Sequence, residues 1–388
     1  MAKKATAPAA EPTKAATTDQ LREPAELRYA NQLIALAQND SDNKPRSWKL
    51  SPRSVLAYIV GSKSLRAGID GKNVDVEITQ KFYGDVGLVE RAIVTLASER
   101  ALLLLGEPGT GKSWLSEHLA AAICGTSGLT IQGTAGTTEE HIKYSWNIAR
   151  IIAEGPTAEN LIPSPTMLAM RSGGLLRFEE ITRCVPDVQD SLVSILSDKA
   201  IAVPELPDGA LVWAKPGFNV IATANSRDQG VNELSAALKR RFNYIHIPII
   251  GDQKTEVEVV QQRAGELMAQ YDLPVKINPP IIVLLATVFR EIRQGKTSEG
   301  VSIKQPSTTV STAEAIGVAL DAALRAKFFG SGNVTSADIA RNVIGSIVKE
   351  DKADLGVLKE YNTLVARKRA LSNKDWKEFH DTLEGQLN

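Results

Sequence analysis

Residues 106–113 combine glycines, a lysine and a serine at the spacing of a phosphate-binding loop. The residues of this P-loop are Gly106, Glu107, Pro108, Gly109, Thr110, Gly111, Lys112 and Ser113. The glycines allow backbone N–H groups to point inward around phosphate oxygens, where a side chain would collide. We expect Lys112 to reach the outer phosphates and the Ser113 hydroxyl to ligate Mg²⁺. The loop therefore predicts that the chain binds ATP together with Mg²⁺.

Two adjacent carboxylates, Glu179 and Glu180, follow the mostly apolar run Leu175–Phe178. A strand that ends in two acids is typical of a Walker B element, in which the first acid holds Mg²⁺, usually through water, and the second orients the attacking water. We assign these roles to Glu179 and Glu180 in that order. Two features depart from the pattern, because the first acid is usually Asp and because Arg177 interrupts the strand. The sequence leaves open whether hydrolysis is fast, and whether the pair is only an exposed acidic strand end.

Asn225 ends the next apolar run, residues 220–224. In P-loop motors an amide at this position, called sensor 1, lies beside the attacking water and the γ-phosphate. We take Asn225 as the candidate for this catalytic role, which Thr223 or Ser226 could share. An Asn at a strand end is also a common turn former, and that alternative stays open.

Arg240 and Arg241 close the stretch that follows. An arginine supplied to the γ-phosphate of a neighbouring subunit accelerates hydrolysis roughly 10³–10⁵-fold. We take Arg241 as the first candidate for such a catalytic finger and Arg240 as the second. The alternative is that both residues only complement the dipole at the end of a helix.

These residues need a scaffold that brings the ends of several strands to one edge. Apolar runs predict strands at residues 101–105, 129–131, 175–178, 220–223 and 244–247. Helical periodicity predicts helices at residues 85–98, 112–124, 185–196 and 234–242. Strand–helix alternation is typical of a parallel sheet covered on both faces. The fold class is therefore predicted to be α/β, a P-loop doubly wound parallel sheet, followed by an all-helical lid domain.

Changes in composition along the chain divide it into five segments. Residues 1–25, rich in Ala, Lys, Pro and Thr, are predicted to be a disordered tail. Residues 26–78 are predicted to be an N-terminal helical segment that ends in a turn-rich stretch around Gly68, Gly71 and Asn73. Residues 79–250 would form the nucleotide-binding domain, residues 251–350 the helical lid domain, and residues 351–388 a helical C-terminal tail.

Composition excludes several classes of partner and location. The chain has 45 basic and 45 acidic residues, so no global basic field predicts a nucleic-acid partner. No apolar run approaches the roughly 18–20 residues that a membrane span requires, so no membrane association is expected. Cys124 and Cys184 have neither metal-ligand spacing nor the number that a disulfide framework needs. These features predict a reduced, cytoplasmic setting.

The order of the motifs resembles that of the AAA+ ATPases, with the P-loop followed by the acidic pair, Asn225 and Arg240-Arg241-Phe242. Residues 179–183 and 188–192 are similar to the D-E-I-N-R and V-Q-x-x-L segments of the MoxR branch. Residues 232–242 are similar to the corresponding segment of MoxR and dynein-related ATPases. The resemblance covers residues 79–345.

This resemblance implies a homo-oligomer, a hexameric ring with ATP bound between subunits. It also implies an insertion before the Walker B strand, at about residues 146–172, and a hairpin formed by residues 199–203 and 211–213. Members of the MoxR branch are chaperone-like remodellers of protein clients. Many of them act with a partner that carries a von Willebrand factor A domain.

The predicted lid departs from the family in one position. The family usually offers a sensor-2 arginine in an S-T-R-E-A or S-P-R stretch. Here Ser311-Thr312-Ala313-Glu314-Ala315 places alanine at that position, and an alternative alignment on residues 306–308 places Thr309 there. Lid closure on the nucleotide is therefore expected to use another cation or to be more weakly coupled to hydrolysis.

The function that these features predict is an ATP-hydrolysing AAA+ ring motor that remodels or activates a protein partner. Three alternatives stay open: a nucleotide-gated scaffold with little turnover, a nucleic-acid-linked GTPase or translocase, and a nucleotide kinase. The GTPase reading depends on Asn225-Ser226-Arg227-Asp228, which resembles the Asn-rich sensor stretch of restriction-type GTPases. The kinase reading lacks any visible acceptor-site signature.

Overall fold

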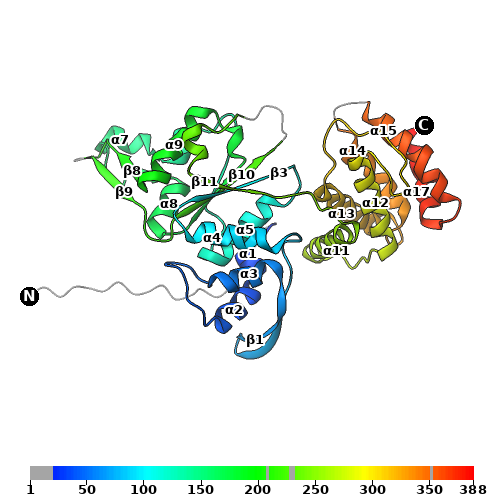
Figure 1. The fold of residues 1–388 in the computed structure, drawn as a ribbon, viewed down its shortest axis with the longest axis horizontal. Helices are drawn as coiled ribbons and strands as arrows, with labels where there is room; N and C mark the ends of the chain where they lie inside the picture. Colours follow the sequence, from blue (N-terminus) through cyan, green and yellow to red (C-terminus); the bar gives the residue numbers. More distant parts are fainter. Residues whose placement is uncertain (1–20, 207–208, 227–231, 350–352) are drawn as a thin grey trace, which may run out of the picture.

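The computed structural model describes residues 21–206, 209–226, 232–349 and 353–388. Along the chain lie an N-terminal segment, an α/β domain and an all-helical domain (Figure 1). Residues 1–20 of the predicted disordered tail lie outside the described residues. Ala25, the last residue of that predicted tail, already opens the first helix.

The N-terminal segment contains three short helices and a β-hairpin, so the prediction that residues 26–78 are helical is wrong for its second half. The elements are α1 (Ala25–Arg28), α2 (Ala30–Asn39), α3 (Pro52–Val60), β1 (Ser62–Ile69) and β2 (Lys72–Ile78). Ile69 pairs with Lys72, which leaves Asp70 and Gly71 as a two-residue loop, both at positive φ. Asp-Gly is a favoured hairpin loop, and the glycines that predicted irregular turns belong to this hairpin.

The α/β domain is built on a five-stranded parallel sheet with the strand order β11-β3-β10-β7-β4. Its strands are β3 (Ala101–Gly106), β4 (Thr130–Gln132), β7 (Leu175–Glu179), β10 (Asn219–Asn225) and β11 (Phe242–His246). The helices of this domain are α4 (Val86–Ala97), α5 (Lys112–Cys124), α6 (Glu139–Ile142), α8 (Pro165–Ser172), α9 (Pro186–Asp198) and α10 (Ala236–Lys239). The predicted doubly wound sheet is thus confirmed.

Both faces of the sheet are buried, because successive side chains of a strand point to opposite sides. Leu102 and Leu104 of β3 pack with Leu115 in the core beneath α4 and α5. Leu103, between them, packs with Phe178 of β7 in the core beneath α8 and α9. The continuous apolar run of β3 follows from this two-sided burial.

The helix predicted at residues 234–242 is wrong in extent. α10 covers only Ala236–Lys239, and Phe242 is the first residue of β11. Leu234, Leu238 and Phe242 are all buried, but they lie on a loop, a helix and a strand in turn. Their spacing of four therefore reflects burial at a helix–strand junction and not one continuous helix.

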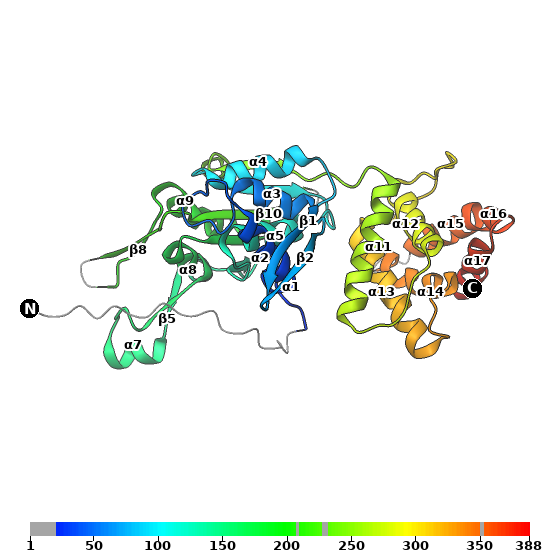
Figure 2. The ribbon, with the colours of Figure 1, turned by 90° about the horizontal axis from the view of Figure 1, so that it is seen from below.

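Two projections extend from the α/β domain on the side away from the helical domain (Figure 1, Figure 2). The first is the strand pair β5 (Tyr144–Trp146) and β6 (Leu161–Pro163), which carries α7 (Ile148–Glu154) between its strands. The second is the antiparallel hairpin of β8 (Ala200–Val203) and β9 (Ala210–Trp213). The hairpin lies where it was predicted. The predicted insertion is only partly correct, because its end, Pro165–Ser172, forms α8 and packs on the sheet.

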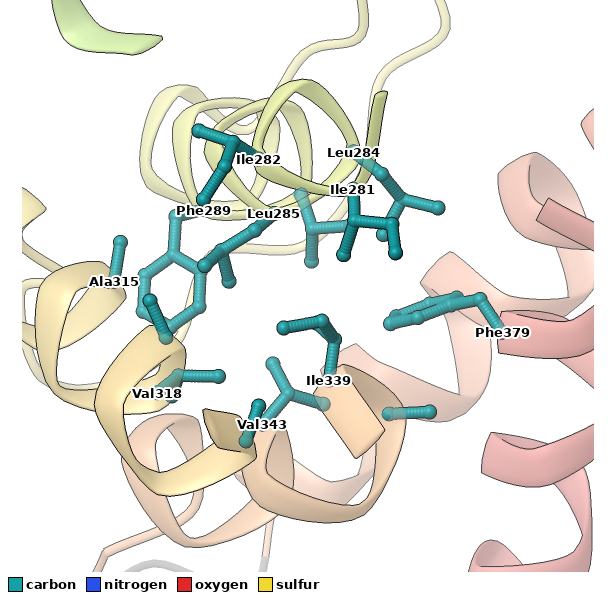
Figure 3. Packing of buried hydrophobic residues seen from close by; sticks show 14 of the residues in the cluster. Ile281, Ile282, Leu284, Leu285, Phe289, Ala315, Val318, Ile339, Val343 and Phe379 are labelled. Atoms are coloured by element: carbon teal, nitrogen blue, oxygen red, sulfur yellow. The ribbon is translucent and has the colours of Figure 1, made fainter. Parts of the chain in front are cut away.

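The helical domain has one continuous apolar core (Figure 3). Its helices are α11 (Gln253–Gln270), α12 (Pro279–Gln294), α13 (Thr312–Phe329), α14 (Ser336–Ile347), α15 (Asp354–Tyr361), α16 (Arg367–Ala370) and α17 (Lys374–Leu387), with a π-helical turn at Asn362–Ala366. Leu285 and Phe289 of α12 lie over Ile339 and Val343 of α14 (Figure 3). None of the helices in the described ranges has both the length and the apolar character that a bilayer crossing needs.

The C-terminal helices belong to the helical domain, so the predicted separate tail at residues 351–388 is corrected. Phe379 and Leu383 of α17 are fully buried in the same core as α12 and α14. Arg369 of α16 donates two hydrogen bonds to the Glu291 carboxylate of α12, at 3.0 and 2.7 Å. Charged side chains predicted an independent tail, but several of them make contacts within the domain.

Phe379→Ala is expected to destabilise the helical domain by about 3–5 kcal/mol, the usual effect of truncating a fully buried aromatic residue. Urea unfolding followed by circular dichroism measures the change. Lys377→Ala, an exposed change on the same helix, is the matched control and should lie within about 0.5 kcal/mol of the wild type. Equal stability of the two variants would show that α17 is only loosely attached.

Candidate functional site

A cavity of about 930 Å³ lies between the α/β domain and the helical domain. The P-loop forms one wall, and Glu180, Thr223 and Asn225 lie at the carboxyl edge of the sheet. Residues 80–84 and 247–252 form a second wall. The helical domain contributes Arg263, Arg293 and the start of α13. The predicted binding residues Pro108–Ser113 and the predicted catalytic residues Glu180 and Asn225 therefore meet in one space.

The P-loop connects the buried strand β3 to α5, and its glycines are required by geometry. Gly109 and Gly111 have φ values of 75° and 84°, in a region of backbone conformation that residues other than glycine rarely adopt. A Cβ at Gly106 would lie 2.6 Å from the Ile247 carbonyl oxygen. A Cβ at Gly109 would lie 2.2 Å from the Cβ of Ser311, at the N-terminus of α13. The loop thus keeps its backbone bare on the cavity side.

Lys112, the first residue of α5, keeps its ammonium group within the loop. Its side chain donates hydrogen bonds to the carbonyl oxygens of Gly106, at 3.0 Å, and Glu107, at 2.8 Å. Lys112 is only 7 % exposed and lines the cavity. The amino terminus of α5 adds the positive end of its dipole at the same place. Positive charge is therefore concentrated where a phosphate would lie.

Glu179, the predicted metal residue of β7, contacts the predicted metal ligand Ser113 directly. The Ser113 hydroxyl donates to Glu179 Oε2 at 2.6 Å, and the Thr223 hydroxyl donates to the same oxygen at 2.7 Å. Glu179 Oε1 accepts from the Ser116 hydroxyl at 2.6 Å and from Arg177 Nη2 at 2.8 Å. Burial would raise the pKa of the Glu179 carboxyl, but the Arg177 charge and the three hydroxyl groups hold that pKa below its usual value. Glu179 is therefore an ionised carboxylate beside Ser113.

Glu180 differs from Glu179 because the chain turns sharply between them. Glu180 has a φ of 53°, an uncommon value for a non-glycine residue, and its backbone N–H donates to the Thr223 hydroxyl at 3.0 Å. Its carboxylate pairs with Arg183 and lines the cavity. A Cβ at Gly133 would lie 2.4 Å from the Glu180 carbonyl oxygen, so the neighbouring chain must be glycine at that point. The turn directs one acid beneath the P-loop and the next into the cavity.

Thr223 and Asn225 lie on β10, next to the P-loop strand. Asn225 is in register with Gly106, and both Thr223 and Asn225 line the cavity. Thr223 also joins the two acids, because its hydroxyl donates to Glu179 and accepts from the backbone of Glu180. The Ser226 backbone N–H donates to the Gly106 carbonyl oxygen at 3.2 Å. Residues 227–231, which include Arg227 and Asp228 of the GTPase-like stretch, lie outside the described residues.

Comparison with known proteins matches both domains of the chain. The AAA domain of the dynein-related subfamily matches residues 101–242, and the YehL-like AAA+ ATPase C-terminal domain matches residues 254–385. The uncharacterized protein YehL of Escherichia coli (strain K12) is 42% identical over 341 residues, which are 88% of this chain and 91% of that protein. The chain belongs to the YehL-like AAA+ ATPases.

More distant similarities were also found. An uncharacterized protein of Staphylococcus aureus (strain USA300) is 26% identical over 198 residues, which are 51% of this chain and 72% of that protein. The solved structure of NtrX from Brucella abortus in complex with ATP matches with a TM-score of 0.46 and 14% sequence identity. The match covers 80% of this chain and 70% of the NtrX chain.

In this YehL-like ATPase the two candidate finger arginines lie apart from the cavity of their own chain. In the described part of the chain, the residues that line the cavity do not include Arg240 or Arg241. The Arg241 side chain hydrogen-bonds Ser197 of α9 and the carbonyl oxygen of Ala237. Arg240 is exposed, and its carbonyl oxygen accepts a hydrogen bond from Arg100 Nη2 at 3.1 Å. The structure therefore does not bring these two residues together with Lys112 and Glu180.

The YehL-like helical domain has alanine at the predicted sensor-2 position, and two arginines from other helices line the same cavity. Ala313 and Thr309, the two aligned positions, both line the cavity and carry no charge. Arg293 of α12 donates to both oxygens of the buried Glu256 carboxylate, at 2.8 and 2.7 Å. The Arg263 guanidinium of α11 lies 3.6 Å from the centre of the Trp114 ring. Arg263 and Arg293 were not found from the sequence, because each is distant from any recognisable motif.

Sequence reasoning also missed the wall formed by residues 80–84. Lys81 is 6 % exposed and lies over the rings of Tyr29 and Tyr58, at 4.8 and 4.3 Å from their centres. Burial lowers the pKa of the Lys81 ammonium to about 7, although the charge of Glu266 opposes the shift. Trp114 donates from Nε1 to the Lys81 carbonyl oxygen at 2.9 Å, which joins this wall to the helix that follows the P-loop. A single lysine in a linker carries no spacing signal that could have predicted this position.

Proposed function

We propose that this YehL-like AAA+ protein is a Mg²⁺-dependent ATPase that works as a ring motor. One observation carries the proposal: the P-loop lysine, an acid that contacts the P-loop serine, and a second acid with a sensor amide all line or border one cavity. Such an arrangement matches what phosphoryl transfer to water requires, namely positioning and electrostatic stabilisation. Neither a structural role nor a binding role alone requires the second acid to point into the cavity.

The residues present suit both ATP and Mg²⁺. The bare backbone of Gly109 and Gly111, with Lys112 behind it, suits a triphosphate. Ser113 and the ionised Glu179 would hold Mg²⁺, Ser113 directly and Glu179 through its hydrogen bond to Ser113 or through water. When bound, Mg²⁺ neutralises charge on the outer phosphates. Glu180 would orient the attacking water, and Asn225 would fix the position of that water relative to the γ-phosphate.

The two arginines that lie outside the cavity of their own chain support a ring. A head-to-tail interface that closes by rotation would place Arg241, or Arg240, at the γ-phosphate of the neighbouring subunit. We propose a hexamer of the MoxR type that remodels a protein client in the cytoplasm, with a von Willebrand factor A domain protein as a candidate partner. The projections that carry α7 and the β8–β9 hairpin would contact the client, because they extend away from the helical domain (Figure 2).

Glu180→Gln is expected to lower steady-state phosphate release by about 10²–10⁴-fold, because the amide cannot accept a proton from the attacking water. ATP affinity should stay within about threefold of the wild type, since the change leaves the P-loop and Glu179 intact. Phosphate release and calorimetric ATP titration measure the two effects. Glu140→Gln, an exposed glutamate of the same domain, is the matched control and should match the wild type.

The same measurements separate the alternatives. If the wild type releases no more phosphate than Glu180→Gln, the protein is a nucleotide-gated scaffold. That alternative is favoured by one observation, the pairing of Glu180 with Arg183. Competition between ATP and GTP tests the GTPase reading, because preference for GTP would contradict the proposed ATPase.

A further inference from the structure

Arg177 interrupts the apolar Walker B strand, and its side chain is buried beneath the P-loop helix. Its guanidinium donates from Nε to the Ser116 hydroxyl at 3.1 Å and from Nη1 to the Ser127 carbonyl oxygen at 3.1 Å. Nη2 donates to the Ser113 carbonyl oxygen at 3.2 Å and to Glu179 Oε1 at 2.8 Å. The Arg177 and Glu179 side chains are only 11 and 6 % exposed. Arg177 therefore ties β7 to the first turn of α5.

The pairing follows from the strand. Residues two apart on a strand point to the same face, so Arg177 and Glu179 both extend toward α5. A buried ion pair of this kind is weak evidence for stability, because well-packed apolar residues usually serve as well or better. An apolar residue at 177 would match the strand around it. The arginine thus calls for a role other than stabilising the sheet.

The two oxygens of Glu179 have different partners. Oε1 accepts from Arg177 and Ser116, whereas Oε2 accepts from Ser113 and Thr223. A glutamate is one methylene longer than the aspartate usual at this position, so its carboxylate lies about 1.5 Å further out and has an additional rotatable bond. Holding Oε1 removes that freedom and leaves Oε2 facing the Ser113 hydroxyl.

We propose that Arg177 is a positioning residue for the metal site, and that Arg177 and Glu179 together replace the single aspartate of the usual Walker B strand. The inference rests on the proposed Mg²⁺–ATP function, to which it adds how this chain orients its acid. Arg177 acts through Glu179 and Ser113 and does not itself contact the nucleotide. Removal of an outer-shell partner of this type usually lowers metal affinity about 10–100-fold.

The test is a double-mutant cycle with Arg177→Leu, Glu179→Asp and the double variant. The readout is the Mg²⁺ enhancement, defined as the ratio of the affinities for fluorescent ATP in Mg²⁺ and in EDTA. Arg177→Leu should lower the enhancement about tenfold or more while the affinity in EDTA changes little. Glu179→Asp alone should also lower it, because the shorter acid cannot reach both Arg177 and Ser113. The double variant should recover to within about threefold of the wild type.

Each outcome decides the proposal. An unchanged enhancement in Arg177→Leu, or a double variant that is worse than both single variants, overturns it. If Arg177→Leu does not fold, Glu179→Asp alone still decides, because an unchanged or increased enhancement in that variant contradicts the proposal. Arg171→Leu, an exposed arginine of α8, is the control and should change nothing. The paramagnetic resonance spectrum of bound Mn²⁺ with ATP gives a second readout that is independent of hydrolysis.

The proposed function can fail separately from this inference. Loss of fluorescent-ATP binding in Lys112→Ala, together with an unchanged Mg²⁺ enhancement in Arg177→Leu, would retain the nucleotide site and reject only the positioning role. Unchanged binding in Lys112→Ala would reject the site itself.

Discussion

Lys112→Ala is expected to weaken ATP binding about 30-fold or more, because truncation of a buried, hydrogen-bonded charge costs about 2–5 kcal/mol in affinity. The wild-type ammonium lies within the P-loop, 3.0 Å from the Gly106 carbonyl oxygen and 2.8 Å from that of Glu107. Lys112 is 7 % exposed and is the first residue of α5, so its charge and the helix dipole act at the same proposed phosphate site. A solvent-exposed lysine elsewhere could not replace this charge. Calorimetric titration with Mg²⁺–ATP measures the loss.

Lys63→Ala, on the exposed face of the N-terminal hairpin, is the matched control and should bind ATP as the wild type does. Thermal unfolding of Lys112→Ala without nucleotide should stay close to the wild type, and the stabilisation by ATP should disappear. Full ATP affinity in Lys112→Ala would contradict the nucleotide site and every step proposed from it.

Arg241→Ala is expected to lower phosphate release by roughly 10³–10⁵-fold while leaving ATP affinity nearly unchanged, as an arginine finger stabilises charge only in the transition state. The physical reason is its position, because Arg241 contacts Ser197 and lies outside the cavity of its own chain, so in the proposed ring it would act on a neighbour. Hydrolysis by the wild type should therefore increase with protein concentration as rings form. Steady-state phosphate release over a concentration series measures both effects.

Mixing two inactive variants gives a sharper test of the shared pocket. In a ring of equal parts Lys112→Ala and Arg241→Ala, about a quarter of the interfaces join an intact P-loop to an intact arginine, so about a quarter of the activity should return. Lys239→Ala, an exposed change next to the arginines, is the control for each. If Arg241→Ala alone keeps its activity and Arg240→Ala is inactive, the finger is Arg240.

The nucleotide-binding part of the fold was predictable because its signals are local. The P-loop depends on the conformations of a few consecutive residues, and an uninterrupted apolar run predicts β3. Glu179 could be located because an apolar run precedes it, and the structure makes it the last residue of β7. Glu180 could be identified for the same reason, although its positive φ and its contact with Thr223 could not.

The parts that could not be predicted depend on contacts between distant segments. Arg293 lines the cavity because α12 packs beside α13, and its partner Glu256 lies on a third helix. The C-terminal helices were taken for a tail because their charges are visible in the sequence, whereas the fully buried side chain of Phe379 is decided by tertiary packing. Arg177 was read as a defect of the strand, since its partners lie on α5 and in the loop before β4.

The closeness of Gly109 to Ser311 has a mechanical consequence. No methyl group fits between the Gly109 backbone and the Ser311 side chain, so the start of α13 packs directly on the phosphate loop. Because α13 shares one core with α14, α15 and α17, a displacement of the start of α13 would be transmitted to these helices. A residue larger than glycine at position 109 would therefore displace the start of α13, and this displacement would reach α17 through the shared core.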